Sequence, residues 1–376
     1  MIKNCDYKKR TEKIINALKK NKIDALVALS LENVYYLTGA YIMTQKDLPD
    51  RLEIPVFSVN SDPIFIVCKI EESLVRKESW IKDVRGYIEF QESPIQFLVE
   101  ALIELGLKEG HIGIEKNYIT SLYFEELNNA LPKAEFINCR DIFEEVRMIK
   151  DKGEIEILAK GAKATRKAVD AAFITAKPGD TERQLANQVT INLLNQGADK
   201  LDFICLGTGY RSQLTHPIPA DIPLILGDIL KIDFGGVFSG YLSDLARTAV
   251  IGKPSLKQYD IYKKLREIQK EVIEYMKIGV RLCDIYQKCK DLFGKKGKLP
   301  FDMPHIGHGL GIGPHERPMI NPISEDVLQE NMVINVEPLV ILKDYGYHVE
   351  DLVLITKNGA EILTGSDLSQ DIPEIS

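Results

Sequence analysis

Apolar residues recur along most of the chain with the period of a helix or the short run of a strand, and these patterns predict its elements. Helical spacing predicts helices near 8–20, 92–105, 119–130, 153–176, 181–196, 257–277 and 282–293. Short apolar runs predict strands near 24–29, 55–58, 63–68, 111–114 and 135–137, and again near 229–234 and 332–340. The first ~145 residues alternate helix and strand signals, which is typical of an α/β domain.

A charged segment, 144–152, separates this first part from the long helical pattern that follows. A chain of 376 residues is long enough for two domains, at roughly 150 residues per domain. We therefore expect domains at 1–145 and 146–376.

The composition and charge of the chain argue against nucleic-acid-binding and membrane-spanning functions. The net charge of −7, without a long basic block, argues against a nucleic-acid partner. Apolar stretches are too short for a membrane span, and the first residues show no signal-peptide pattern, so we expect a cytoplasmic protein.

Two carboxylates interrupt predicted strands. Asp233 lies in the apolar run 229–234, and Glu337 lies in the run 332–340. A carboxylate buried in a strand needs a cation or strong hydrogen-bond donors, because an isolated buried charge is costly. A salt bridge to a buried arginine is the structural alternative for any one acid.

Each of these acids has a second acid at hairpin spacing. Asp244 follows Asp233 by eleven residues, which fits a two-residue loop at Phe238-Ser239 and makes the acids direct cross-strand neighbours, with Cβ atoms roughly 4.5–5.5 Å apart. Glu350 follows Glu337 by thirteen residues, across a loop at 343–346. Two such hairpins predict a duplicated scaffold that closes around one site.

The densest motif is the Gly/His-rich segment 304–318, in which glycines flank His308. These glycines would let the backbone approach a metal closely while the imidazole stays accessible. Four carboxylates and one imidazole form the ligand set of a site for two hard-to-borderline divalent cations.

The segments DFGGVFSGYLSDLART, GHGLGIGPHERP, NVEP and VED follow one another in this order. In these motifs, and over nearly its whole length, the chain resembles the pita-bread metallopeptidases, which include Xaa-Pro aminopeptidase, Xaa-Pro dipeptidase (prolidase) and methionine aminopeptidase, with the metal-free creatinase as a relative. The resemblance implies a creatinase-like N-terminal α/β domain, 1–145, followed by a C-terminal pita-bread catalytic domain, 146–376, of α+β type. The first domain, with its NVYYLTG segment, favours the proline-directed branch, since methionine aminopeptidases lack it.

By this resemblance Asp233 would bind one metal and His308 the other, while Asp244 and Glu350 would bridge the two. Glu337 would be both a ligand and the general base. The expected cofactors are two divalent cations per subunit, with Mn²⁺ first and Co²⁺, Fe²⁺ or Zn²⁺ as alternatives.

His216 and His315 stand where the family has substrate-contacting histidines, and they would hydrogen-bond the scissile carbonyl and the oxyanion. The implied activity is hydrolysis of Xaa-Pro bonds in small peptides through a metal-bridging hydroxide, of aminopeptidase P or prolidase type. A homodimer is the expected assembly.

Two positions depart from the family pattern. His348 stands where proline-specific members usually carry arginine, and Pro304 stands where they often have histidine, with His305 one residue later. We expect His348 to bind substrate, but with weaker selection for a substrate carboxylate than arginine would give. Alternative functions are hydrolysis of a C–N bond in a small non-peptide amide or amidine, and a binding protein that has lost catalysis.

Overall fold

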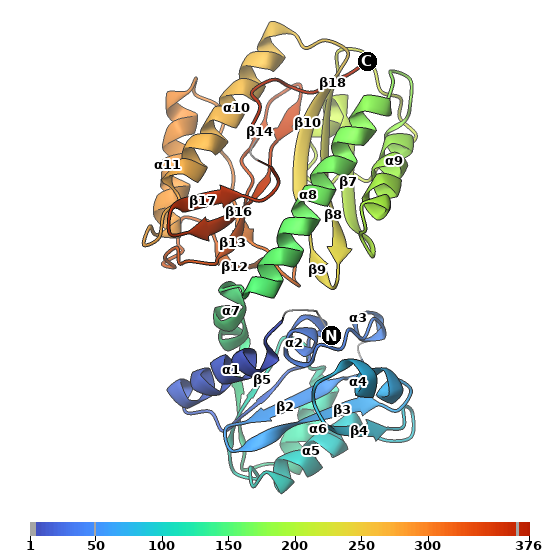
Figure 1. The fold of residues 1–376 in the computed structure, drawn as a ribbon, viewed down its shortest axis with the longest axis vertical. Helices are drawn as coiled ribbons and strands as arrows, with labels where there is room; N and C mark the ends of the chain where they lie inside the picture. The colour runs from blue at the N-terminus through green and yellow to red at the C-terminus, as the bar shows by residue number, and fades with distance from the viewer. Residues whose placement is uncertain (1–4, 49, 366–367) are drawn as a thin grey trace. The chain divides into compact units, whose positions relative to one another are not determined.

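Residues 5–48, 50–365 and 368–376 are described in a computed structural model of the chain, whose contacts separate it into two units, Met1–Arg147 and Met148–Ser376 (Figure 1). The family-implied order, an α/β unit followed by a mixed α+β unit, agrees with this structure. Each unit has its own sheets and its own apolar core.

The N-terminal unit is built on a six-stranded mixed sheet in the order β4-β3-β2-β1-β5-β6. Its strands are β1 (Ala25–Val27), β2 (Ile54–Ser58), β3 (Ser61–Cys68), β4 (Asp83–Tyr87), β5 (His111–Ile114) and β6 (Glu135–Asn138). Its helices are α1 (Tyr7–Asn21), α2 (Leu31–Thr38), α3 (Thr44–Asp47), α4 (Glu72–Glu78), α5 (Pro94–Glu104), α6 (Ser121–Ala130) and α7 (Arg140–Met148). One face of the sheet packs against α5 and α6 through residues such as Val27, Ile112, Leu98 and Leu127.

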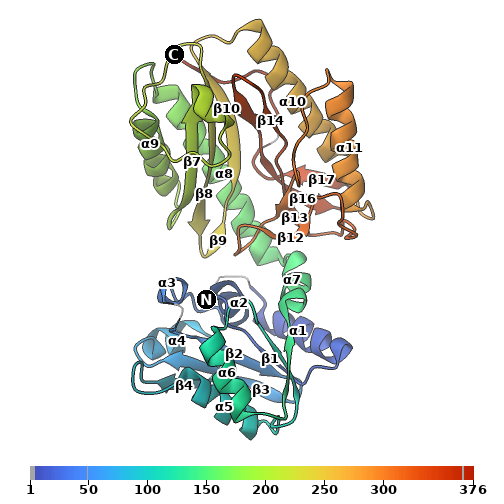
Figure 2. The same ribbon diagram turned by 180° about the vertical axis from the view of Figure 1, so that it is seen from behind.

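The C-terminal unit contains two main sheets, antiparallel except for the parallel pair β10–β18, and two helix pairs (Figures 1 and 2). The first sheet has β7 (Lys200–Thr208), β8 (Ile229–Phe238), β9 (Tyr241–Leu242), β10 (Leu245–Ile251) and β18 (Glu374–Ile375). It packs on α8 (Lys152–Thr175) and α9 (Glu182–Asn195), and a short 3₁₀ turn, η1 (Gly209–Gln213), follows β7.

The second sheet has β12 (Glu316–Met319), β11 (His308–Gly309), β13 (Val333–Val336), β16 (Asp351–Thr356) and β17 (Gly359–Ile362). It packs on α10 (Leu256–Tyr275) and α11 (Leu282–Lys295). A two-stranded ribbon, β14 (Leu339–Ile341) with β15 (Gly346–His348), extends the hairpin that contains β13 and β16.

The helices have the boundaries that their capping residues dictate. Asp151, Thr181 and Ser255 each form a capping box with the residue three positions later, which satisfies free backbone N–H groups at the starts of α8, α9 and α10. The seven helices predicted from periodicity are all present, with ends that differ by a few residues at most. Each helix pair precedes the hairpin strands of one sheet, a repeated order of elements that agrees with the duplicated scaffold expected from the two acid-bearing hairpins.

Among the described residues, no helix is both long and apolar enough to cross a membrane.

Candidate metal centre

The central strand β8 turns Asp233 away from the helices that cover its sheet. Leu230, Ile232 and Phe234 belong to the core formed with α8 and α9. Since neighbouring side chains of a strand point to opposite faces, Asp233 and Lys231 lie on the other face. The apolar alternation of β8 therefore fixes which face carries the acid.

The first hairpin has a different register from the one expected. Its two-residue loop is Ser239-Gly240, with φ of 50° and 78°, and Phe238 pairs with Tyr241. Asp233 is then opposite Ala246, not opposite Asp244. The prediction of direct cross-strand neighbours was wrong. Asp244 is two residues before Ala246 and points to the same face of the sheet, so Asp233 and Asp244 are diagonal neighbours on that face.

A glycine permits the approach of the chain that carries Asp244. A Cβ atom at Gly235 would lie 1.9 Å from the carbonyl oxygen of Ser243, the residue before Asp244. Any larger residue at 235 would push this segment away from β8 and move Asp244 with it.

The second hairpin keeps the expected register. Val336 pairs with Asp351 on one side and Leu339 pairs with His348 on the other, which places Glu337 opposite Glu350. The reversal occurs at residues 343–344, where the Leu342 N–H donates to the Tyr345 carbonyl over 2.9 Å. Gly346, expected in the loop, already belongs to β15.

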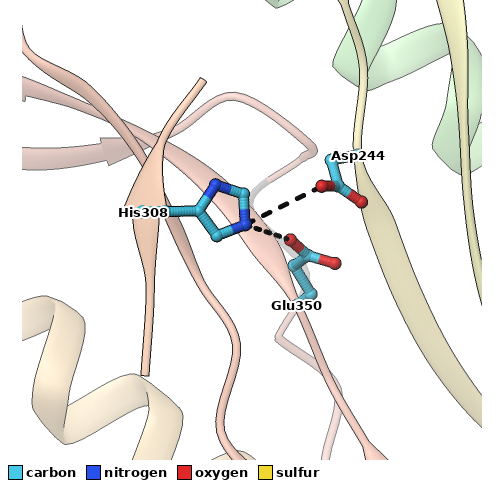
Figure 3. A group of neighbouring side chains, drawn as sticks. All are labelled: Asp244, His308 and Glu350. Carbon is cyan, nitrogen blue, oxygen red and sulfur yellow. Dashed lines mark ion pairs between the residues drawn. The ribbon is translucent and has the colours of Figure 1, made fainter. Parts of the chain in front are cut away.

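His308 joins the two hairpins from β11. Its Nε2 atom lies 3.8 Å from Asp244 Oδ2, 3.9 Å from Glu350 Oε1 and 3.3 Å from Glu337 Oε1. Figure 3 shows the ring directed at Asp244 and Glu350, which come from different parts of the sheet system. Asp244, His308 and Glu350 are buried, and their ligand atoms lie within 4.8 Å of one another. Donor atoms at about 2.1 Å from a common cation are separated by roughly 3–4 Å, so these positions suit metal ligation.

The electrostatics of the acids indicate missing positive charge. Burial, together with the charges of Asp233 and Glu337, raises the pKa of Asp244 well above its ordinary value. Burial and the same neighbours, with Asp244 added, do this to the pKa of Glu350. Burial also raises the pKa of Asp233, although His348 opposes the rise.

In the described part of the chain, each of these acids and Glu337 has one buried side-chain oxygen that accepts no hydrogen bond: Asp233 Oδ1, Asp244 Oδ1, Glu337 Oε1 and Glu350 Oε1. Unsatisfied buried oxygens are costly in a native protein and need a partner. Divalent cations fit this donor set, because they supply positive charge and accept oxygen and imidazole ligands together.

Glu337 differs from the other three acids. Burial raises the pKa of its carboxyl, but three histidines, His305, His348 and His308, outweigh that effect, so the pKa lies below its ordinary value. His305 Nδ1 lies 3.3 Å from Glu337 Oε1, and His348 Nε2 lies 3.5 Å from Glu337 Oε2. These histidines therefore favour the ionised form of Glu337.

The remaining histidines surround this cluster. The ring of His315 stacks on His308 with centroids 4.0 Å apart, and its side chain is solvent-exposed. His216 is exposed as well and interacts electrostatically with both neighbours: it opposes the rise that burial causes in the pKa of Asp233, and it adds to the lowering that burial causes in the pKa of His315. His348 is buried, with Nδ1 at 3.8 Å from Asp233 Oδ2.

His305 is the site histidine to which sequence reasoning assigned no role. It was noted only as an offset from the family position at Pro304, yet its ring also contacts those of His308 and His315 in edge-to-face geometry, with centroids 6.2 and 5.7 Å apart. The density of histidines in 304–318 was the signal that could have included it.

Two buried ion networks support the centre without joining it. Asp351, next to Glu350, accepts from Arg247 Nη2 at 2.6 Å and Arg266 Nη1 at 2.9 Å. Arg247 Nη1 also donates to the carbonyl oxygens of Ala246 at 2.9 Å and Glu350 at 2.5 Å, so it ties the two hairpins together.

The second network is the ion pair of Lys150 Nζ with Glu316 Oε2, 2.7 Å long. Glu316 Oε1 accepts from the Gly313 N–H at 2.8 Å. This pair therefore holds the loop that carries His315.

Comparison with known proteins agrees with this geometry. Residues 156–357 match the model of metallopeptidase family M24, and residues 10–149 match that of the creatinase/prolidase N-terminal domain. The chain is 32% identical to an Xaa-Pro dipeptidase of Pyrococcus horikoshii over 360 residues, which cover 95% of this chain and 97% of that protein.

Solved structures are similar over the same length. The prolidase of Pyrococcus horikoshii superposes with a TM-score of 0.83 at 31% identity, covering 96% of this chain and 99% of that one. An X-Pro aminopeptidase of Thermotoga maritima gives a TM-score of 0.84 at 26% identity, covering 97% and 99%. Two family models in the expected order and relatives of nearly equal length show that this chain belongs to metallopeptidase family M24, with the pita-bread fold behind a creatinase/prolidase N-terminal domain.

Proposed function

We propose that this peptidase hydrolyses Xaa-Pro bonds with two divalent cations, as a prolidase or an aminopeptidase P. The observation that carries the proposal is the cluster of four acids near His308 and His348, each with one buried oxygen that accepts no hydrogen bond in the described structure. Relatives named Xaa-Pro dipeptidase and X-Pro aminopeptidase support the proline-directed activity.

The metal ligands would be distributed over both hairpins. Asp233 would hold one cation and His308 the other, with Asp244 and Glu350 between them and Glu337 beside them. Cations bound here would polarise the scissile carbonyl and make a water acidic enough to react near neutral pH. The oxygen-rich set favours Mn²⁺, Co²⁺ or Fe²⁺ over a structural zinc site.

Glu337 has the properties of the general base. Burial would raise the pKa of its carboxyl, but three imidazoles outweigh burial and keep that pKa low, and Glu337 lies between His308 and His348. An ionised carboxylate in this position can take a proton from a water and pass it on to the leaving nitrogen.

His315 and His216 would contact the substrate. Both rings are exposed, while His308 behind them is buried, so they form the accessible border of the centre. A ring N–H from either residue would stabilise the negative oxygen that develops during attack on the carbonyl.

His348 would set the substrate range. It occupies the inner wall, 3.5 Å from Glu337, where the family usually has a permanently charged arginine. The smaller imidazole leaves more room and lacks the planar fork that binds a carboxylate through two hydrogen bonds. We therefore propose a specificity that depends less on a free substrate carboxylate than that of a typical prolidase.

The test combines metal counting with a substrate panel. Protein reconstituted with Mn²⁺, Co²⁺ or Zn²⁺ would be assayed on Xaa-Pro dipeptides, longer Xaa-Pro peptides, methionine-initiated peptides and creatine, with Glu337→Gln as the matched inactive control. We expect two metals per chain and cleavage of Xaa-Pro substrates by the wild type alone. One bound metal per chain or fewer would contradict the dinuclear site. Cleavage of creatine alone would indicate a non-peptide C–N hydrolase. Inactivity on the whole panel would indicate a binding protein.

A further inference from the structure

A lysine is buried in the strand that carries the first metal ligand. Lys231 lies two residues before Asp233 on β8 and on the same face of the sheet. It is only 2% exposed. An ammonium group is costly to bury, and an apolar side chain would fill a strand without that cost. The charge at this position therefore calls for a specific partner.

The partners are two backbone carbonyls. Lys231 Nζ donates to the carbonyl oxygen of Leu214 over 2.5 Å and to that of Thr215 over 3.3 Å. These residues directly precede His216. Leu214 is 47% exposed, so this part of the loop is not fixed by burial of its own apolar residue.

The strand next to β8 makes room for this arrangement. Gly207 of β7 is the cross-strand partner of Lys231. A Cβ atom at Gly207 would lie 2.7 Å from the Arg211 carbonyl oxygen and 2.9 Å from Pro217 Cγ. The loop thus lies directly on β7, and the lysine of the adjacent strand can reach its carbonyls.

We propose that Lys231 is a positioning residue that fixes residues 214–215 so that the next residue, His216, faces the metal centre. The inference rests on the proposed function, in which His216 contacts the substrate. Two charge-assisted hydrogen bonds from a rigid central strand hold a segment that lies outside the regular strands and helices. Lys231 acts through the loop and touches neither substrate nor reacting atoms.

The alternative role is electrostatic. Lys231 opposes the rise in the pKa of Asp233, so its charge could serve only to moderate the acids of the metal centre. In that case its removal would change metal binding and leave the loop unchanged. The two roles differ in what they affect, and each has its own measurement.

The experiment is a double-mutant cycle with Lys231→Met, His216→Ala and the combined variant, in Mn²⁺-reconstituted protein. Lys231→Met keeps the length of the side chain and removes its donors. Lys200→Met, on β7 of the same sheet, is the control for loss of a lysine. We expect Lys231→Met to lower kcat/KM for an Xaa-Pro peptide by roughly 10- to 100-fold, as displacement of a positioned group does. The combined variant should be no slower than His216→Ala alone, because both changes remove the same contribution.

Backbone amide hydrogen exchange measures how firmly the loop is held and needs no substrate. The backbone amides of residues 211–216 and 218 should exchange at least about ten-fold faster in Lys231→Met than in the wild type or Lys200→Met, with the metal content unchanged. If Lys231→Met does not fold, Lys231→Gln takes its place in both measurements.

The proposal would be overturned if the two single-variant losses of kcat/KM multiply in the combined variant. It would also be overturned if amide exchange at 211–216 and 218 is the same in Lys231→Met as in the wild type, or if the metal content of Lys231→Met changes. If the wild type cleaves no Xaa-Pro bond, the proposed function fails, while the exchange comparison still decides whether Lys231 holds the loop.

Discussion

Replacing Asp351 by asparagine should destabilise the C-terminal unit strongly, although asparagine has almost the same shape. Asp351 is fully buried and accepts hydrogen bonds from Arg247 at 2.6 Å, Arg266 at 2.9 Å, Gln269 at 3.1 Å and Thr364 at 2.6 Å. Asp351→Asn would leave two buried guanidinium groups without their counter-charge and would place amide hydrogens against donors.

The magnitude follows from the charges that Asp351 balances. Burial alone would raise the pKa of its carboxyl, but Arg247 and Arg266 outweigh burial and lower it from 3.8 to about 2. That shift corresponds to about 2 kcal/mol, which is present above pH ~4 and is lost as the pH falls through 2. Removal of one partner from a buried ion network typically costs about 3–5 kcal/mol, because the other charges stay buried. For a unit of this size we expect the Tm to fall by roughly 10 °C.

The assay is thermal and urea unfolding at pH 7 in the presence of chelator, so that metal binding does not mask the change. Asp170→Asn is the matched control, because Asp170 also pairs with an arginine, Arg166, at 2.7 Å but is 45% exposed. The control should lose less than about 1 kcal/mol. Equal losses in the two variants, or a loss below about 1 kcal/mol in Asp351→Asn, would refute this account of the network.

Four further predictions concern the centre itself. Glu337→Gln should abolish turnover while substrate still binds, because it removes the proposed base; a variant with measurable kcat and weakened binding alone would argue against that role. His315→Ala should lower kcat by roughly 10²–10³-fold, and near-full activity would remove this ring from catalysis. Asp244→Asn should reduce metal occupancy and raise the Tm of the protein in chelator. Because the pKa of Asp244 is raised in the folded state, its carboxyl destabilises the metal-free protein more as the pH rises. An increase in Tm that does not grow with pH would contradict this explanation. His348→Arg should increase the rate on Xaa-Pro dipeptides relative to longer peptides, and an unchanged ratio would make the substitution neutral.

Periodicity was sufficient for the helices and for most strands, because each of these elements buries one apolar face. The β8 strand shows why it also located the acids: alternation with Leu230 and Ile232 leaves Asp233 on the opposite face. The loop of the first hairpin was predicted one residue too early, which shifts the cross-strand partner of Asp233 by two residues, from Asp244 to Ala246. That loop requires two successive residues with positive φ, and Gly240, at the second position, satisfies this with little strain.

Contacts between distant segments could not be derived from spacing. His305 meets Glu337 through the packing of a loop on a sheet, 32 residues apart in sequence. Asp351 illustrates the alternative that was raised for every buried acid: it adjoins a proposed ligand in the sequence, but two arginines neutralise it. Only the tertiary structure separates the acid that is paired from the acids that need a cation.

The ion pair of Lys150 with Glu316 limits how the C-terminal unit can be produced by itself. Lys150 is the third residue of that unit, whereas its partner lies 166 positions later, in the loop that carries His315. A recombinant fragment that starts at α8, with Lys152, would keep every proposed metal ligand and lose this lysine. We expect such a fragment to bind metal yet to hold His315 poorly, whereas a fragment that starts a few residues earlier would retain both properties.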